Sequence, residues 1–174
     1  DDAALARYRR RPVRRHNMGP HLRYWFGTGD PELGRHLTET AVDWVQGAVN
    51  MYLHQGHLIT LGFAPHHQTR VLTALNLTDA ILAGPHLTPE LRRRLLAQIA
   101  FLGYTVDRDD YWDPERGYGA NPNMTSTVAA YQAVTAGIIP AHPRAETWMQ
   151  PAMEELKDKE LDTWSDENGG WLDA

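Results

Sequence analysis

The sequence predicts an all-α chain, and two observations carry that prediction. Apolar residues recur at three- and four-residue spacing through several long segments, as on one face of a helix. A polar capping residue is followed by Pro and Glu at Asp30-Pro31-Glu32 and again at Thr88-Pro89-Glu90, which is typical of a helix start. The one alternating apolar segment, Ile59–Phe63, is too short to indicate a sheet.

The helices are expected at these approximate ranges: 1–10, 30–56, 66–83, 88–106, 125–137 and 144–163. Pro151 should kink the last helix or divide it in two. We expect loops at His16–Gly29, Tyr111–Ser126 and Trp164–Trp171, because Gly, Pro and polar residues gather there. Helices of alternating length with such connectors favour antiparallel helix pairs, arranged as a solenoid or as an incomplete (α/α) toroid.

Length and composition bound the function. The 174 residues fit one domain, and 42% apolar residues can form its core. The net charge of −5 argues against a dedicated nucleic-acid binder, and the absence of cysteine excludes disulfides and thiolate chemistry. No apolar run approaches the roughly 20 residues of a membrane span. Because the chain begins without Met and ends without a cap, we expect residues 1–174 to be part of one toroid domain in a longer protein.

The charge is unevenly distributed. Residues 1–15 hold six arginines and two aspartates, whereas residues 150–174 hold eight acids and two lysines. We interpret the basic run as a solvated helix end and linker, and the acidic run as an exposed helix face. The alternative for the basic run is a cationic lip that binds an anionic polymer.

The segment Tyr111–Ser126, with the sequence YWDPERGYGANPNMTS, is the main candidate for function. It leads an aromatic, amide-rich loop into a helix of small residues, and one of the Asn, Thr and Ser residues (Asn121, Asn123, Thr125 or Ser126) would suffice as the N-cap. The surplus of polar groups indicates a binding role. The first turn of the 66–83 helix is also polar, but its adjacent His66 and His67 face different directions and make a poor metal pair.

The order of these features resembles the N-terminal helical toroid of heparinase II/III-like and alginate-lyase-like polysaccharide lyases. The resemblance covers about residues 60–174. It rests on Thr69-Arg70 near a helix start, Asn121–Asn123 before a small-residue helix, a helix containing Trp148, and the turn Asp166–Trp171. In this family an Asn at the start of an inner helix contacts the uronate, and a later acidic turn lies near the same cleft. The family often has His after that Asn, whereas Met124 stands here.

The resemblance implies a lyase that cleaves a uronate-containing polysaccharide by β-elimination. Such a reaction needs a group that neutralises the substrate carboxylate and stabilises the enolate-like intermediate, together with groups that transfer protons. Asn123 is the candidate neutraliser and Asn121 the second choice, while Tyr118 is the nearest candidate for proton transfer. The candidates for contacts with sugar rings or anionic groups are Trp112, Tyr111, Tyr118, Arg70, His67 and Glu167.

The implied partners are an acidic polysaccharide or oligosaccharide and the remainder of a longer chain, with no nucleic acid and no membrane span. No cofactor or metal is expected within these residues. The family resemblance favours secretion or a periplasmic location, although the sequence contains no signal peptide.

Two alternatives stay open. A helical-toroid glycoside hydrolase would need two carboxylates facing a cleft, and the sequence offers Asp110, Asp113, Glu115 and Glu167. A non-catalytic α-solenoid that binds protein or glycan would need no catalytic group. On that interpretation Asn123 is an N-cap, and Trp112, Trp148 and Trp164 are packing residues. The aspartates at 107–113 lack the spacing of a calcium loop.

Overall fold

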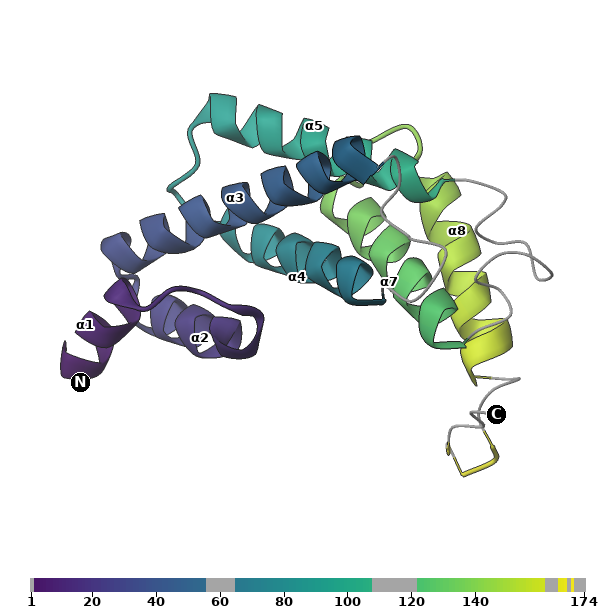
Figure 1. Ribbon diagram of the computed structural model, residues 1–174, viewed down its shortest axis with the longest axis horizontal. Coiled ribbons are helices and arrows are strands. Elements are labelled where there is room, and N and C mark those ends of the chain that lie inside the picture. The colour runs from purple at the N-terminus through teal and green to yellow at the C-terminus, as the bar shows by residue number, and fades with distance from the viewer. Residues whose placement is uncertain (1, 56–64, 108–121, 162–165, 169, 171–174) are drawn as a thin grey trace.

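A computed structural model describes residues 2–55, 65–107, 122–161, 166–168 and 170 (Figure 1). The helices are α1 (Asp2–Arg10), η1 (Arg15–Asn17), α2 (Met18–Thr28), α3 (Pro31–Gln55), α4 (Pro65–Leu82), α5 (Pro89–Val106), α7 (Pro122–Ile138), α8 (Ala145–Glu155) and the π-helical η3 (Leu156–Leu161). These residues contain no strand, which confirms the all-α prediction. None of the described helices has the length and hydropathy needed to cross a membrane.

The four long helices begin in the same way, because each has proline as its first residue: Pro31, Pro65, Pro89 and Pro122. Proline suits this position, since its missing N–H would have no partner there and its φ angle is already helical. Two of the starts are closed by the predicted caps. The Leu33 N–H donates to Asp30 Oδ1 at 2.8 Å, and the Leu91 N–H donates to Thr88 Oγ1 at 3.2 Å.

The long helices form two neighbouring pairs. Helix α3 packs against α4 and α5, while α7 packs against α4, α5 and α8. In Figure 1, α3 and α5 lie side by side and run in one direction, whereas α4 and α7 run back in the other direction beneath them. Helices α4 and α7 therefore start at the same end of the layer that they share. This arrangement determines which of the predicted site residues can act together.

The core lies between these helices. On α4, buried residues occupy more than one face: Val71, Thr73, Ala74, Leu75, Leu77, Thr78 and Ile81. Its buried hydroxyl at Thr78 donates to the Ala74 carbonyl at 2.8 Å, so the burial leaves that donor satisfied. The neighbouring helices contribute further core residues, including Leu33, Leu37, Ala41 and Val45 from α3 and Leu95, Ile99, Leu102 and Val106 from α5. Helix α4 is thus enclosed by its neighbours.

The prediction of a loop at His16–Gly29 is wrong, because most of this segment is helix α2. His21 and Trp25 are four residues apart and both are buried, so they give α2 an apolar stripe that anchors it. Pro20 lies in the first turn, where a missing N–H is tolerated. Gly29 then ends the helix in the left-handed conformation with φ 64°, donating its N–H to the Trp25 carbonyl at 2.8 Å.

Helix α7 begins earlier than expected, and Pro151 does not divide the last predicted helix. Helix α7 begins at Pro122, so the last five residues of the predicted Tyr111–Ser126 loop are helical. Asn123 is therefore the second residue of the helix, and the interpretation of Asn123 as the N-cap is wrong. Pro151 lies inside α8 and does not divide it there, because the helix continues to Glu155 before it widens into η3.

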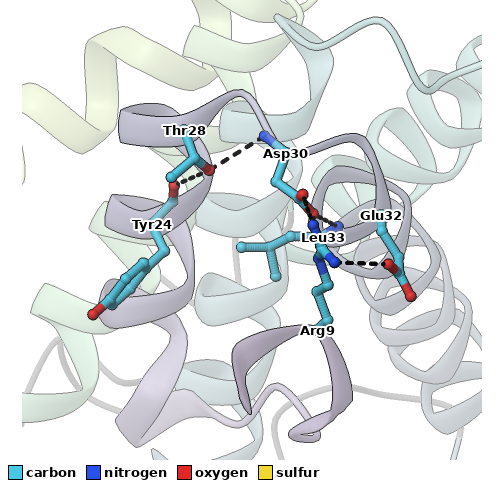
Figure 2. A network of polar contacts seen from close by, with 6 residues as sticks. All are labelled: Arg9, Tyr24, Thr28, Asp30, Glu32 and Leu33. Atoms are coloured by element: carbon cyan, nitrogen blue, oxygen red, sulfur yellow. Dashed lines mark hydrogen bonds and ion pairs between the residues drawn. The ribbon is translucent and has the colours of Figure 1, made fainter. Parts of the chain in front are cut away.

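A polar network ties α1 to the start of α3 (Figure 2). Arg9 forms a two-point ion pair with Asp30, in which its Nε donates to Oδ1 at 3.0 Å and its Nη2 to Oδ2. Its Nη1 lies 3.4 Å from Glu32 Oε2. The hydrogen bond from Arg9 holds the pKa of Asp30 below its usual value; burial acts in the opposite sense, and the Leu33 N–H assists Arg9. Arg9 is therefore a structural residue.

We predict that Asp30→Asn removes one component of the pH dependence of folding. The folded-state pKa of Asp30 is lowered, so its charge contributes stability above about pH 4 and this contribution is lost as the pH falls toward the folded-state value. Asn can still cap α3, so the variant should lose about 1 kcal/mol at neutral pH through the ion pair alone. Urea unfolding between about pH 3 and pH 7 would measure both effects.

The matched control is Asp79→Asn, which changes an exposed aspartate on α4. It should leave both the stability and its pH dependence close to those of the unchanged protein. An Asp30→Asn variant with the original pH dependence would contradict the assignment.

Candidate functional site

The predicted site residues fall into two groups. His67 and Arg70 belong to the first six residues of α4, Asn123 is the second residue of α7, and Glu167 lies in the turn near the C-terminal end. The other candidates lie outside the described residues: Tyr111, Trp112, Tyr118, Asn121 and, for the hydrolase alternative, Asp110, Asp113 and Glu115.

The fold brings the helix starts that carry His67, Arg70 and Asn123 to the same end of the layer formed by α4 and α7. Helices α4 and α7 pack against each other and both begin toward the right of Figure 1. The first turn of a helix exposes free backbone N–H groups and a positive partial charge, so two such turns at one end favour an anion. The segment η3, which leads toward Glu167, also packs against α7.

The turn that holds Glu167 is organised by its neighbour Asp166. Asp166 Oδ1 accepts the N–H groups of Asn168 at 2.8 Å and Gly170 at 2.6 Å, and the Asp166 N–H donates to the Gly170 carbonyl at 2.8 Å. Glu167 itself is exposed. Asp166 therefore shapes the turn, and Glu167 is the carboxylate that the turn presents to solvent.

An ion pair fixes the chain at the point where it leaves α5 for the 108–121 segment. Asp107 directly follows α5, and Arg144 directly precedes α8. Arg144 Nη2 and Nε lie 2.5 Å and 3.2 Å from Asp107 Oδ2. Asp107 is thus paired with a cation, and no group of three potential metal ligands occurs among the described residues.

Buried hydrogen bonds hold α7 against α5. Tyr131 OH donates to the Leu102 carbonyl at 2.5 Å, and Thr105 Oγ1 donates to the same carbonyl at 2.6 Å. Thr135 Oγ1 donates to the Tyr131 carbonyl at 2.8 Å. The bond from Tyr131 crosses from α7 to α5, and Tyr131 OH also lies 3.4 Å from Thr105 Oγ1, so this buried cluster fixes α7 on α5 at that point. The start of α7, and with it Asn123, is placed by this contact.

Trp148 is a core residue, which agrees with its interpretation as a packing residue. Its side chain is 0% exposed, and its ring stacks on His142 with centroids 4.9 Å apart. Tyr104 meets the indole edge-on at 5.2 Å. The indole also lies against Gly103, where an added Cβ would come within 2.7 Å of the ring. This close approach fixes α8 on α5.

The structure also shows a pocket that the sequence interpretation missed. A cavity of about 410 Å³ lies between α3, α4 and η1, with these described lining residues: Arg15, Asp43, Trp44, Gly47, Ala48, Met51, Val71 and Thr73. Its apolar lining with a few polar groups is typical of small-molecule sites. The residues come from three distant segments, so only the helical spacing of Trp44, Gly47 and Met51 could have indicated it.

Comparisons of the chain with protein-family models, curated proteins and solved structures found no match.

We predict that Gly103→Ala destabilises the protein by about 1–3 kcal/mol, because the new methyl group would overlap Trp148 in a closely packed region. Thr135 Cγ2 lies 3.0 Å from the same position and limits any shift of the indole. Chemical denaturation would give the change in the free energy of unfolding.

Gly137→Ala is the matched control, since a Cβ at this exposed α7 position meets no atom within 4 Å. That variant should be neutral or slightly more stable. Equal stability of the two variants would show that Trp148 does not pack tightly on Gly103.

Proposed function

We propose that this chain is part of a polysaccharide lyase that cleaves an acidic, uronate-containing polysaccharide by β-elimination. The observation that carries the proposal is the common end at which α4 and α7 begin, because these helices contain His67, Arg70 and Asn123. Two helix N-termini at one end favour a carboxylate ligand. A carboxylate next to the reacting carbon is the group that such a lyase must neutralise.

The helix arrangement is compatible with the proposed domain. The pairs α3–α4 and α5–α7 lie next to each other, and α8 continues from the second pair. We propose that residues 1–174 form part of one incomplete (α/α) toroid, with α4 and α7 on the side that lines the substrate cleft. Further helices of a longer chain would complete the cleft.

In the proposed reaction, the Asn123 amide binds the substrate carboxylate and stabilises the enolate-like charge after the α-proton leaves. Asn121 is the second choice for this role. Tyr118 is the proposed proton-transferring group, and an adjacent group would protonate the leaving glycosidic oxygen. Trp112 and Tyr111 would stack on sugar rings, while Arg70, His67 and Glu167 would contact neighbouring units. No cofactor within this chain is part of the proposal.

The family resemblance that suggests this activity also suggests secretion or a periplasmic location. We include that location in the proposal, since acidic polysaccharides are extracellular substrates.

The test is to incubate the native protein with a panel of polyuronates and to record near-ultraviolet absorbance, since β-elimination creates a conjugated double bond at the new non-reducing end. Asn123→Ala should lower kcat by roughly 100-fold or more, because it removes stabilisation that exists mainly in the transition state. The matched control is Asn76→Ala, which changes an exposed asparagine on α4 and should retain activity.

The other outcomes assign different functions. New reducing ends without ultraviolet absorbance would indicate a glycoside hydrolase. Saturable binding without any cleavage would indicate a binding module. Either result would contradict the proposed lyase.

A further inference from the structure

Positive charge is concentrated at the N-terminal end of an acidic chain. Residues 1–36 contain eight of the 17 Lys and Arg residues but only four of the 22 acids. Arg9 is committed to Asp30 and Glu32. The arginine turn, which we define as residues Arg10–Arg15, carries four more arginines at positions 10, 11, 14 and 15. All four are exposed, and none pairs with a carboxylate in the part of the chain that the structure describes.

Side chains of η1, α2 and α3 hold the backbone of the arginine turn. The Arg11 carbonyl accepts hydrogen bonds from His21 Nε2 at 3.1 Å and His36 Nε2 at 3.2 Å. Buried Asn17 donates from Nδ2 to the Pro12 carbonyl at 3.1 Å and accepts the Arg14 N–H at 2.7 Å. A linker would not need this many fixed contacts. The charged side chains therefore extend from a preorganised backbone, which lowers the entropic cost of binding a partner.

The arginine turn ends at the pocket between α3 and α4, because its last residue, Arg15, is also one of the residues that line this pocket. Trp44 provides an aromatic surface in this pocket, Asp43 provides a carboxylate, and Gly47 leaves open space where a side chain would otherwise lie. On the other side the pocket reaches Val71 and Thr73 of α4, directly after Arg70. The pocket thus lies between the arginine turn and the start of α4.

These groups suit an acidic sugar. An aromatic side chain can stack on a sugar ring, a carboxylate accepts hydrogen bonds from sugar hydroxyls, and a guanidinium binds a carboxylate through two parallel hydrogen bonds. A nucleic-acid backbone suits the pocket less well, because Asp43 would face phosphates that have no proton to donate. The net charge of −5 also disfavours a long nucleic acid.

We propose that the pocket and the arginine turn form an extended binding site for an acidic glycan. One sugar ring occupies the pocket against Trp44, its carboxylate binds Arg15, and its hydroxyls donate to Asp43. The following units run along Arg14, Arg11 and Arg10, and the preceding units lead to the start of α4. The identity of the glycan rests on the proposed function, whereas the location of the site rests on the residues described here.

The experiment uses isothermal titration calorimetry to measure the Kd of the native protein for a defined uronate oligosaccharide. The titration is done under conditions in which the oligosaccharide is not cleaved, at a lowered temperature if cleavage has to be stopped. Arg15→Ala should weaken binding by about tenfold, since it removes a charge-assisted pair. Arg93→Ala is the matched control, because Arg93 is an exposed arginine on α5 outside the site. Added salt should weaken binding to the unchanged protein more than binding to Arg15→Ala.

A second variant tests the pocket without removing charge. Gly47→Leu should fill the open space and weaken binding by a similar factor, whereas Gly47→Ala should have a small effect. Circular dichroism and thermal unfolding would confirm that both variants fold. Unchanged Kd values for Arg15→Ala and Gly47→Leu would overturn the proposed site, whether or not the protein cleaves polyuronates.

The outcomes separate this inference from the proposed activity. Binding that depends on Arg15 and Gly47 without any elimination product would support the site and contradict the lyase. Tighter binding of single-stranded DNA of equal length through the same two residues would overturn the glycan assignment.

Discussion

Two indole rings that pack directly on glycine residues hold the outer parts of this fold in place. Trp25 of α2 lies where an added Cβ would approach it to 2.7 Å at Gly34 and to 2.8 Å at Gly84. Trp148 of α8 has the equivalent contact at Gly103 of α5. A large ring that meets backbone without an intervening side chain buries much apolar surface in one defined position. Trp25 docks α2 on α3 and on the connector that follows α4, and Trp148 docks α8 on α5.

Each tryptophan supports one of the two regions that we associate with ligand binding, which are the arginine turn and the start of α7. Trp25 and His21 are four residues apart on α2, so the helix that packs on α3 also supplies a hydrogen bond to the arginine turn. Trp148 packs on α5 beside the point where Tyr131 of α7 bonds to the Leu102 carbonyl. The rigid helices thus carry polar groups at their starts and connections, as rigid scaffolds commonly do at binding sites.

The helix starts could be predicted from the sequence wherever the signal is local. Asp30-Pro31 and Thr88-Pro89 each contain both the cap and the first helical residue, so a short segment determines the result. Helix α2 could not be predicted in this way. Its Gly19 and Pro20 look like turn residues, and its anchors His21 and Trp25 become informative only when α1, α3 and the connector after α4 cover them.

The same distinction applies to the candidate site. Polar composition alone drew attention to Asn123, and the fold adds that α4 begins at the same end as α7. The pocket depends on Arg15, Trp44 and Val71, which are far apart in the sequence and meet only through the pairing of α3 with α4. Helical spacing could indicate only that Trp44 shares a face of α3 with Gly47 and Met51, because the meeting with Arg15 and Val71 depends on the fold.

The most direct test is to titrate the isotope-labelled protein with a uronate oligosaccharide that it does not cleave. Nuclear magnetic resonance spectra would record the amide chemical shifts at each step of the titration. The account predicts saturable shifts in the first turns of α4 and α7 and in residues Arg10–Arg15. Shifts confined to other surfaces, or no saturable shifts at all, would contradict the claim that this end of the helix layer and the arginine turn bind an acidic glycan.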